Sequence, residues 1–384
     1  MKKIVIIGAN DFQNPLILKA REMGYQTHVF AWKEGAVGEQ TADYFYPVSI
    51  VEKEEILEEC KKIMPDAVAS IGSDLANITV QYLAARLGLC TNSDRCILYS
   101  TNKFEMRRAL VRNHISAPLF TVVDNKRSIQ LPRDMTYPII VKPTDRSGSR
   151  AITKVFGEEE LEGAVEAAIF HSFEKKAILE EYIDGEEYSC EGISYNGQHT
   201  FLALTRKYTT GAPHFIETGH VEPAGLSPEL EARVFHELGM ALDALEIRNG
   251  ASHSEFRINS RQEVKIIEIG SRMGGDCIGS HLVPLSTGQD YLKMVIQTAL
   301  GEMPEILKEP LHHFARIQFI LGSGDMEKYR KIKEKYPLNI VFTSEIGEVG
   351  SHEVIDSGSR FGFYIIKTRD YCKMQEIETE LEIL

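Results

Sequence analysis

The stretch that most constrains the fold of this chain runs from His253 to Gly275. Residues 252–258 alternate between polar and apolar side chains, as in a strand with one buried face. Residues 264–269 are rich in β-branched side chains and end at a glycine, and residues 260–263 form a polar connection of hairpin length. The stretch therefore predicts a β-hairpin that carries charged side chains on one face.

Two glutamates of this hairpin are candidates for a metal site. If Asn259 pairs with Val264, which is an assumption about the register, Glu255 lies directly opposite Glu268 on the same face. Two carboxylates this close repel each other unless a cation lies between them, and oxygen ligands suit Mg²⁺ or Mn²⁺. Arg272, just past the second strand, adds a planar cation suited to a phosphate or a carboxylate. An exposed hairpin edge with unrelated charges is an equally good interpretation of this stretch alone.

Length and composition exclude several classes of protein. A chain of 384 residues is too long for one small core, so two or three domains are expected. The net charge of -13 argues against a nucleic-acid partner, because phosphate binding needs clustered Lys and Arg. No apolar run reaches membrane-spanning length, so no membrane is expected. The six cysteines have no paired spacing, which favours the reducing cytoplasm.

The first part of the chain predicts a parallel sheet. Residues 3–7 and 27–31 form short apolar strands on either side of a helix that begins near Pro15, and this order favours parallel pairing. Residues 66–71 predict a further strand of the same sheet. Because Gly8 follows the first strand without a GxGxxG pattern, we do not expect a nicotinamide cofactor.

The middle of the chain carries candidate phosphate contacts. Lys103 lies in the first turn of a helix predicted over 102–112, where the helix dipole disfavours a cation unless an anion compensates it. The strand 137–142 ends in Lys142, and the small-residue loop 144–150 can lay backbone N–H groups against phosphate oxygens. The loop lacks P-loop spacing. A solvated lysine and an ordinary hairpin tip are the competing interpretations.

A second predicted hairpin, formed by residues 177–183 and 187–194, is crowded with carboxylates. Its acidic residues are Glu180, Glu181, Glu186 and Glu187. Solvated strand faces explain some of them. A purine pocket explains others, because a carboxylate accepts hydrogen bonds from the adenine amine or from ribose hydroxyls.

The remaining segments show no catalytic signature of their own. Residues 207–223 are rich in turn formers and polar side chains, which predicts a substrate-facing loop. Cys277 has no neighbouring histidine and is interpreted as a small packed residue. From about Pro304, short strands alternate with charged helices and predict a small α/β unit.

Taken in order, these segments resemble the ATP-grasp superfamily from the first strand to Gly301. The matching segments are Lys103, IVKP at 140–143, SGSR at 147–150, LEEYIDGEEYS from Leu179, HSEF around Glu255 and EIGSRMGG from Glu268. A segment ExGHxxPA, here Glu217 to Ala224, is similar to that of the amino-acid ligase-like and carbamoyl-phosphate-synthase-like branch. Gly270 stands where many members have Asn, and Ala151 stands where Gly is common.

The resemblance implies an α/β chain, α+β in its lid, with the ATP-grasp fold. Residues 1–95 would form a Rossmann-like domain and residues 96–305 the ATP-grasp domain, which has a mobile lid at about 117–183 and a C-terminal platform. Residues 306–384 would form a small C-terminal α/β subdomain. ATP would lie between the antiparallel sheets of the lid and the platform.

The resemblance also implies roles for individual residues. The ATP phosphates would meet Lys103, Lys142, Ser147, Gly148 and Ser149. The adenine and the ribose would meet Glu180, Glu181, Tyr182, Ile183 and Glu187. Mg²⁺ or Mn²⁺ would be held by Glu255 and Glu268. Catalysis would fall to Arg272 and Lys142, and the substrate would meet Glu217, His220, Arg272, Gly274 and Gly275. His220 and His253 are candidate bases by proximity in sequence only.

The activity that the resemblance implies is an ATP-dependent, ADP-forming carboxylate–amine ligase. Such an enzyme activates a small carboxylate as an acyl phosphate and joins it to an amine. One alternative keeps the fold and phosphorylates bicarbonate, as in carboxylases and carbamoyl phosphate synthesis. Another is a nucleotide-binding protein without turnover. The expected partners are a small carboxylate and an amine, and the oligomeric state is left open, with a homodimer as one candidate.

Overall fold

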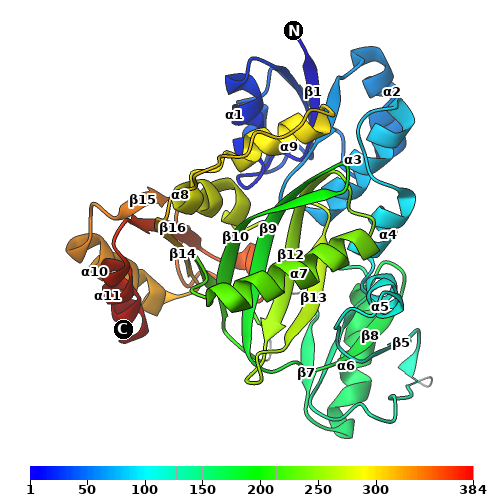
Figure 1. Ribbon diagram of the computed structural model, residues 1–384, viewed down its shortest axis with the longest axis vertical. Coiled ribbons are helices and arrows are strands. Elements are labelled where there is room, and N and C mark those ends of the chain that lie inside the picture. The colour runs from blue at the N-terminus through cyan, green and yellow to red at the C-terminus, as the bar shows by residue number, and fades with distance from the viewer. Residues whose placement is uncertain (127–128, 149, 213–214, 384) are drawn as a thin grey trace.

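The computed structural model describes residues 1–126, 129–148, 150–212 and 215–383. Three sheets organise these residues: a four-stranded parallel sheet, a four-stranded antiparallel sheet and an eight-stranded antiparallel sheet (Figure 1). This architecture is the α/β fold, with an α+β middle part, that the sequence predicts.

The N-terminal sheet has the strand order β3-β2-β1-β4, and its strand pairs are parallel, as predicted. Its elements are β1 (Lys3–Ile7), α1 (Asn14–Glu22), β2 (Gln26–Phe30), β3 (Tyr44–Tyr46), α2 (Lys53–Ile63), β4 (Ala67–Ala69) and α3 (Asp74–Leu87). Ile4 and Ile6 enter the core on the α1 side, whereas Val5 and Ile7 enter the core on the α2 side. Burial on both faces explains why β1 is a continuous apolar run.

The middle sheet, called the lid sheet below, has the order β5-β8-β6-β7. Helices α4 (Asp94–Thr101) and α5 (Lys103–Arg112) lead into it. Its elements are β5 (Phe120–Val123), β6 (Ile139–Pro143), β7 (Thr153–Val155), α6 (Glu158–His171) and β8 (Ala177–Glu181). Leu161 and Val165 of α6 pack with Ile139 and Leu179, so one face of the lid sheet is covered and the other is available for a ligand.

The eight-stranded sheet, called the platform below, has the order β13-β12-β9-β10-β11-β14-β16-β15. Its first strands are β9 (Glu186–Tyr195), β10 (Gln198–Thr209), β11 (Glu217–Glu222), β12 (Gly250–Ile258) and β13 (Val264–Gly270). Its last strands are β14 (Phe314–Ile320), β15 (Ile340–Thr343) and β16 (Gly362–Thr368). Strands from both sides of the predicted boundary at residue 305 therefore belong to one sheet. The division into three domains stays a prediction.

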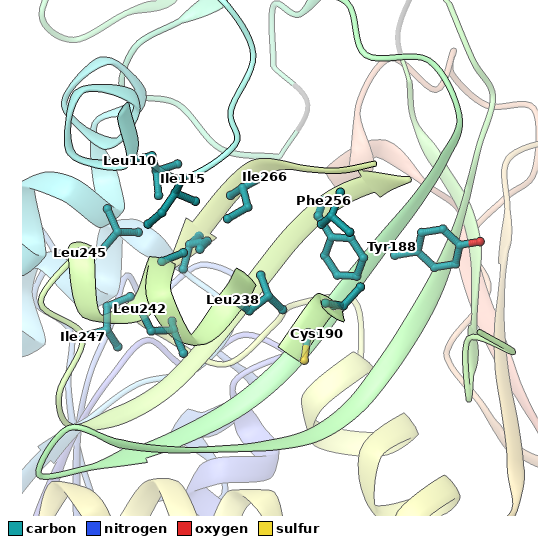
Figure 2. Close-up of a cluster of buried hydrophobic side chains, with 14 of the residues drawn as sticks. Leu110, Ile115, Tyr188, Cys190, Leu238, Leu242, Leu245, Ile247, Phe256 and Ile266 are labelled. Atoms are coloured by element: carbon teal, nitrogen blue, oxygen red, sulfur yellow. The ribbon is translucent and has the colours of Figure 1, made fainter. Parts of the chain in front are cut away.

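Helix α7 (Pro228–Ala244) lies across the platform and builds its core. Leu238 and Leu242 of this helix pack against Tyr188, Phe256 and Ile266 of the strands (Figure 2). The helix begins where the Ser227 hydroxyl accepts a hydrogen bond from the backbone N–H of residue 230, a favourable N-cap. The opposite face of the platform is thus free to hold polar site residues.

The other helices surround the sheets. They are α8 (Val283–Thr287), α9 (Tyr291–Ala299), α10 (Ser323–Lys335) and α11 (Tyr371–Ile383), with a π-helical turn at Ile278–Leu282. Among the helices that the structure describes, none has the length and apolar composition needed to cross a bilayer.

The prediction of a substrate-facing loop over residues 207–223 is wrong for most of that segment. Residues 207–209 end β10, and Glu217–Glu222 form β11. Strand β11 is paired on both sides, with β10 and with β14, so backbone pairing overrides the turn-forming composition.

Candidate nucleotide and metal site

A cleft lies between the lid sheet and the platform. Figure 1 shows the lid strands below the ends of β12 and β13. The apolar part of the lining is Pro118, Ile140, Ile152, Ile183 and Ile267. The charged part includes Lys142, Glu187, Lys207, Glu217, Glu255 and Glu268. The empty volume of about 710 Å³ is within the range of small-molecule sites.

Glu255 on β12 lies directly opposite Glu268 on β13, as predicted, although the register differs from the assumed one. Ile258, not Asn259, pairs with Val264, and a β-bulge directly after Glu255 shifts the strand by one residue. The bulge brings the two glutamates opposite each other on the cleft side.

Each of these carboxylates is held by a buried lysine. Oε1 of Glu268 is 2.9 Å from Nζ of Lys103, which is 4% exposed. Glu255 pairs with Lys207 and lies 3.2 Å from Nε2 of His253. Although burial opposes ionisation, Lys207 and His253 hold the pKa of Glu255 well below its ordinary value. Glu255 is therefore an anion at neutral pH.

This arrangement fits a divalent cation that is bound together with phosphate oxygens. Within the described residues, no three His, Cys, Asp or Glu side chains form a metal site of their own. Mg²⁺ is usually held by one or two carboxylates plus substrate phosphates. Glu255 and Glu268 would supply these two carboxylates, and the lysines beside them would meet the phosphates.

Lys142 and Glu180 meet Arg107 in a buried cluster on the lid side of the cleft. Nζ of Lys142 is 2.7 Å from Oε2 of Glu180, and Nε of Arg107 is 2.7 Å from Oε1. All of these side chains are at most 4% exposed. Although burial favours the neutral acid, Arg107 and Lys142 hold the pKa of Glu180 below its ordinary value. Both oxygens of Glu180 are thus in ion pairs, and its contact with adenine remains a prediction.

Arg272, predicted to be catalytic, is anchored by an aspartate of the N-terminal region. Its Nε is 2.7 Å from Oδ1 of Asp74, and its Nη2 is 3.0 Å from Oδ2. Gly270 leaves room for this pair, because a Cβ there would lie 3.2 Å from Oδ1 of Asp74 and 3.4 Å from Nε of Arg272. Gly270, which stands where the resemblance would place an asparagine, is therefore in close contact with the ion pair between Arg272 and Asp74.

A buried carboxylate, Glu191, organises the turn after β13. It pairs with Nδ1 of His253, and its Oε2 accepts a hydrogen bond of 3.0 Å from the backbone N–H of Gly274. A Cβ at Gly274 would collide with this carboxylate, so glycine is needed there. Burial alone would lower the pKa of His253, but Glu191 and Glu255 raise it to about 9. A charged His253 is a hydrogen-bond donor, which makes it unsuitable as a base at neutral pH.

The predicted adenine and ribose residues line the part of the cleft formed by β8 and the start of β9. Arg257 connects them: its Nη2 is 2.9 Å from Oε2 of Glu187, and its Nη1 donates to the carbonyl oxygen of Ile183 at 3.0 Å. Tyr182 lines the same part, and Glu181 accepts a hydrogen bond of 3.1 Å from the N–H of residue 119. These contacts fix the segment that joins the lid to the platform.

The predicted phosphate loop borders a second cavity. Ser147 lines it together with Lys103 and Glu268. Gly148 has a φ of 74°, which favours glycine, and Ser149 lies outside the described residues. Ala151 has a φ of 54°, so a position where glycine is common adopts the glycine-like conformation with an alanine.

The predicted substrate residues are spread along β11 and the turn after β13. Oε2 of Glu217 accepts a hydrogen bond of 2.5 Å from the Ser357 hydroxyl, and Nε2 of His220 is 3.5 Å from Oδ2 of Asp276. Burial lowers the pKa of His220. Gly275 borders the N-terminal region, where a Cβ would lie 3.6 Å from the backbone of residue 72. Glu217 lines the cleft, whereas the fully buried His220 is not among the lining residues.

Several charged residues at the site were not anticipated from the sequence. They are Asp74, Arg107, Glu191, Lys207 and Arg360. Lys207 carried the one local signal: it is a lysine near the end of a strand, β10, as Lys142 is near the end of β6. The others reach the site from elements that are distant in sequence.

The fold and the cleft define an α/β protein in which two antiparallel sheets enclose a site of buried lysines and paired glutamates. Residues 135–280 match the family model of the ATP-grasp domain, which identifies this part of the chain as an ATP-grasp domain.

Named proteins with similar sequence or structure extend this assignment. D-alanine–D-alanine ligase B of Chromobacterium violaceum is 32% identical over 174 residues, 44% of this chain and 55% of that protein. Alanine–anticapsin ligase of Bacillus subtilis is 25% identical over 272 residues, 61% of this chain and 56% of that protein. The chain thus spans about half the length of these curated relatives. The crystal structure of L-amino acid ligase from Bacillus licheniformis has a TM-score of 0.83 at 21% identity, covering 100% of this chain and 97% of that one, which shows the shared fold.

Proposed function

We propose that this chain is an ATP-dependent, ADP-forming ligase that joins a small carboxylate to an amine. The observation that carries the proposal is the opposition of Glu255 and Glu268 on the cleft face, each with a buried lysine beside it. The three similar proteins named above are ligases by name, which supports the same reaction class.

The chemistry needs charge neutralisation more than it needs a base. A carboxylate is a poor electrophile until phosphorylation supplies a good leaving group, but its attack on the γ-phosphate brings two anions together. A divalent cation held by Glu255 and Glu268 would neutralise part of this charge. Lys142 would contact the phosphates, and Arg272, held in one orientation by Asp74, would face the phosphoryl group or the attacking carboxylate.

Closure of the lid would protect the acyl phosphate from water. Acyl phosphates hydrolyse, so water must be excluded until the amine attacks the acyl carbon. Lys142 on β6 and Glu255 and Glu268 on the platform line one cleft from opposite sheets, so closure would bring them onto one triphosphate.

The test is ADP release measured with purified protein, ATP and Mg²⁺ over pairs of amino acids, single amino acids and bicarbonate alone. We expect ADP only when a carboxylate and an amine are both present, with a product of the summed mass less one water. ADP release with bicarbonate alone would replace the proposal with the carboxylase-like alternative. ATP binding by calorimetry without ADP from any substrate would mean a nucleotide-binding protein.

A further inference from the structure

A third cavity lies farther along the platform, past β11. One side of it comes from α1, including Leu18, and from the segment that leads into α1, including Phe12. The other side comes from β14, β15 and β16. Its empty volume is about 1270 Å³, against about 710 Å³ for the nucleotide cleft. Within the described part of the chain, its lining includes none of the residues assigned above to ATP or metal.

The cavity and the nucleotide cleft open on the same face of the platform. Lys207 of the cleft pairs across the strands with His220, and His220 pairs with Ile317. Phe319 follows two residues later on β14, hence on the same face, and pairs with Phe363. The ring of His220 is 5.7 Å from that of Phe319, which confirms that they share a face. One ligand can therefore reach from the cavity towards the cleft along this face.

The wall of the cavity is aromatic. The ring of Phe363 lies 6.0 Å from that of Phe12 and 5.7 Å from that of Phe342, with an angle of 20° to each. Phe342 is still 41% exposed, and Leu18 is 49% exposed. Large apolar side chains left open to solvent around a hollow mark a binding site for an apolar group.

Acidic and basic side chains lie at the end of the cavity that borders β11. Arg360 lies 3.6 Å over the ring of Phe319 and holds Asp276 at two points, Nη1–Oδ2 at 3.0 Å and Nη2–Oδ1 at 2.5 Å. Its Nη1 is also 3.5 Å from the carbonyl oxygen of Glu217. Because Glu217 lines the nucleotide cleft and Arg360 lines the cavity, the two sites meet at this contact. Next to it, within the described residues, Nδ1 of buried His220 has no hydrogen-bond partner.

We propose that this cavity holds the large apolar side chain of an amino acid that is one of the two substrates. The inference rests on the proposed ligase function. A zwitterionic head group matches the boundary, where Glu217 and Asp276 offer anions and Arg360 a cation. A phenylalanine- or leucine-sized side chain would cover Phe342 and Phe363, whereas the methyl group of alanine would leave them in water.

The test compares two serine variants. Phe342→Ser removes an exposed ring from the cavity wall, and Phe170→Ser makes the same change at a 75% exposed ring on α6, away from the cavity. ADP release is measured with Gly, Ala, Leu, Met and Phe in turn as the varied amino acid. We expect the wild type to favour Leu, Met or Phe, and Phe342→Ser to raise KM for them about tenfold with little change for Ala. Phe170→Ser should behave as wild type, and both variants should share its thermal unfolding midpoint.

A binding measurement separates the cavity from the reaction. L-phenylalanine is titrated into the protein with ADP and Mg²⁺ present, and the three forms are compared by calorimetry. ADP release that favours Gly or Ala, or that is unchanged in Phe342→Ser, would overturn the cavity assignment and leave the ligase proposal standing. If no pair gives ADP, the ligase proposal fails. Calorimetry then decides the cavity: binding weakened only by Phe342→Ser supports it, and no binding of L-phenylalanine refutes it.

Discussion

Arg272 and Asp74, 198 positions apart in the chain, form a two-point ion pair that joins the turn after β13 to the first turn of α3. Although burial opposes its charge, Asp74 raises the pKa of Arg272 further above its ordinary value. The third nitrogen, Nη1, donates to the carbonyl oxygen of Met273 at 3.2 Å. The guanidinium therefore has one orientation, set by the N-terminal region and not by the platform alone.

Arg272→Lys should separate catalysis from binding. Lysine keeps the charge but loses the planar fork. We expect ATP affinity, measured by calorimetry, to stay near that of wild type, while ADP release at saturating substrate falls about 100-fold or more. Asp74→Asn is the companion variant, because it keeps Arg272 and loosens its orientation, and its effect on turnover should be smaller. A collapse of affinity with intact turnover would make Arg272 a binding residue instead.

Glu268→Gln should remove one proposed anionic ligand of the metal and leave Lys103 without its anionic partner. Turnover should fall by orders of magnitude, with only a modest loss of ATP affinity. Glu263→Gln is the matched control, since Glu263 lies in the exposed hairpin turn and pairs with Arg261. The metal assignment does not survive if Glu268→Gln turns over normally at saturating Mg²⁺.

Glu180→Ala should destabilise the fold, because it leaves two buried cations, Lys142 and Arg107, without their carboxylate. Removal of one partner of a buried ion pair typically costs about 3–5 kcal/mol of unfolding free energy. Urea unfolding measures the loss, and Glu162→Ala, on an exposed helical face, is the control. An unchanged midpoint with a large loss of ATP affinity would favour the adenine-contact role over the structural one.

Glu222→Gln should change how stability depends on pH. Glu222 is fully buried and accepts hydrogen bonds of 2.8 Å from the hydroxyls of Thr205 and Ser286, and burial raises its pKa to about 8 from an ordinary 4.5. The folded chain binds this proton more tightly than the unfolded chain, so this group's stabilising contribution is complete below about pH 4.5 and is lost as pH rises to about 8.

The glutamine variant lacks that titration. We compare the unfolding free energy of the variant with that of wild type at each pH. The difference in favour of the variant should be larger at pH 8.5 than at pH 5, because wild type loses stability over this range. Each unit of difference between the folded and unfolded pKa values is worth about 1.4 kcal/mol. Denaturant unfolding at the two pH values measures this. If the difference between Glu222→Gln and wild type is the same at both, Glu222 is not protonated in the folded chain.

The hairpin of β12 and β13 shows how far local pattern predicts this site. Alternation places Glu255 and Glu268 on one face, and the structure brings them opposite each other. The sequence-based register is nevertheless one residue off at the turn end, and the bulge after Glu255 makes up the difference. The position of such a bulge depends on the partner strand and the turn, so it cannot be predicted from the residue types in the strand itself.

The partners of the site residues were beyond prediction for a different reason. Asp74, Arg107 and Lys207 come from three separate elements, and nothing in their local periodicity reports where those elements meet. Strand β11 was missed because Thr218 and Gly219 have the composition of a turn. Its extended form comes from two neighbouring strands, which are tertiary information.

The unbroken platform has a consequence for how such a protein can change over generations. The paired glutamates stand near one edge of the sheet and the aromatic wall near the other, with β11 between them. Mutations at Phe342, on the outermost strand, can therefore accumulate without disturbing the strands that carry Glu255 and Glu268. Under the proposed function, selection can change which side chain the cavity binds while the cleft that carries Glu255 and Glu268 is inherited unchanged.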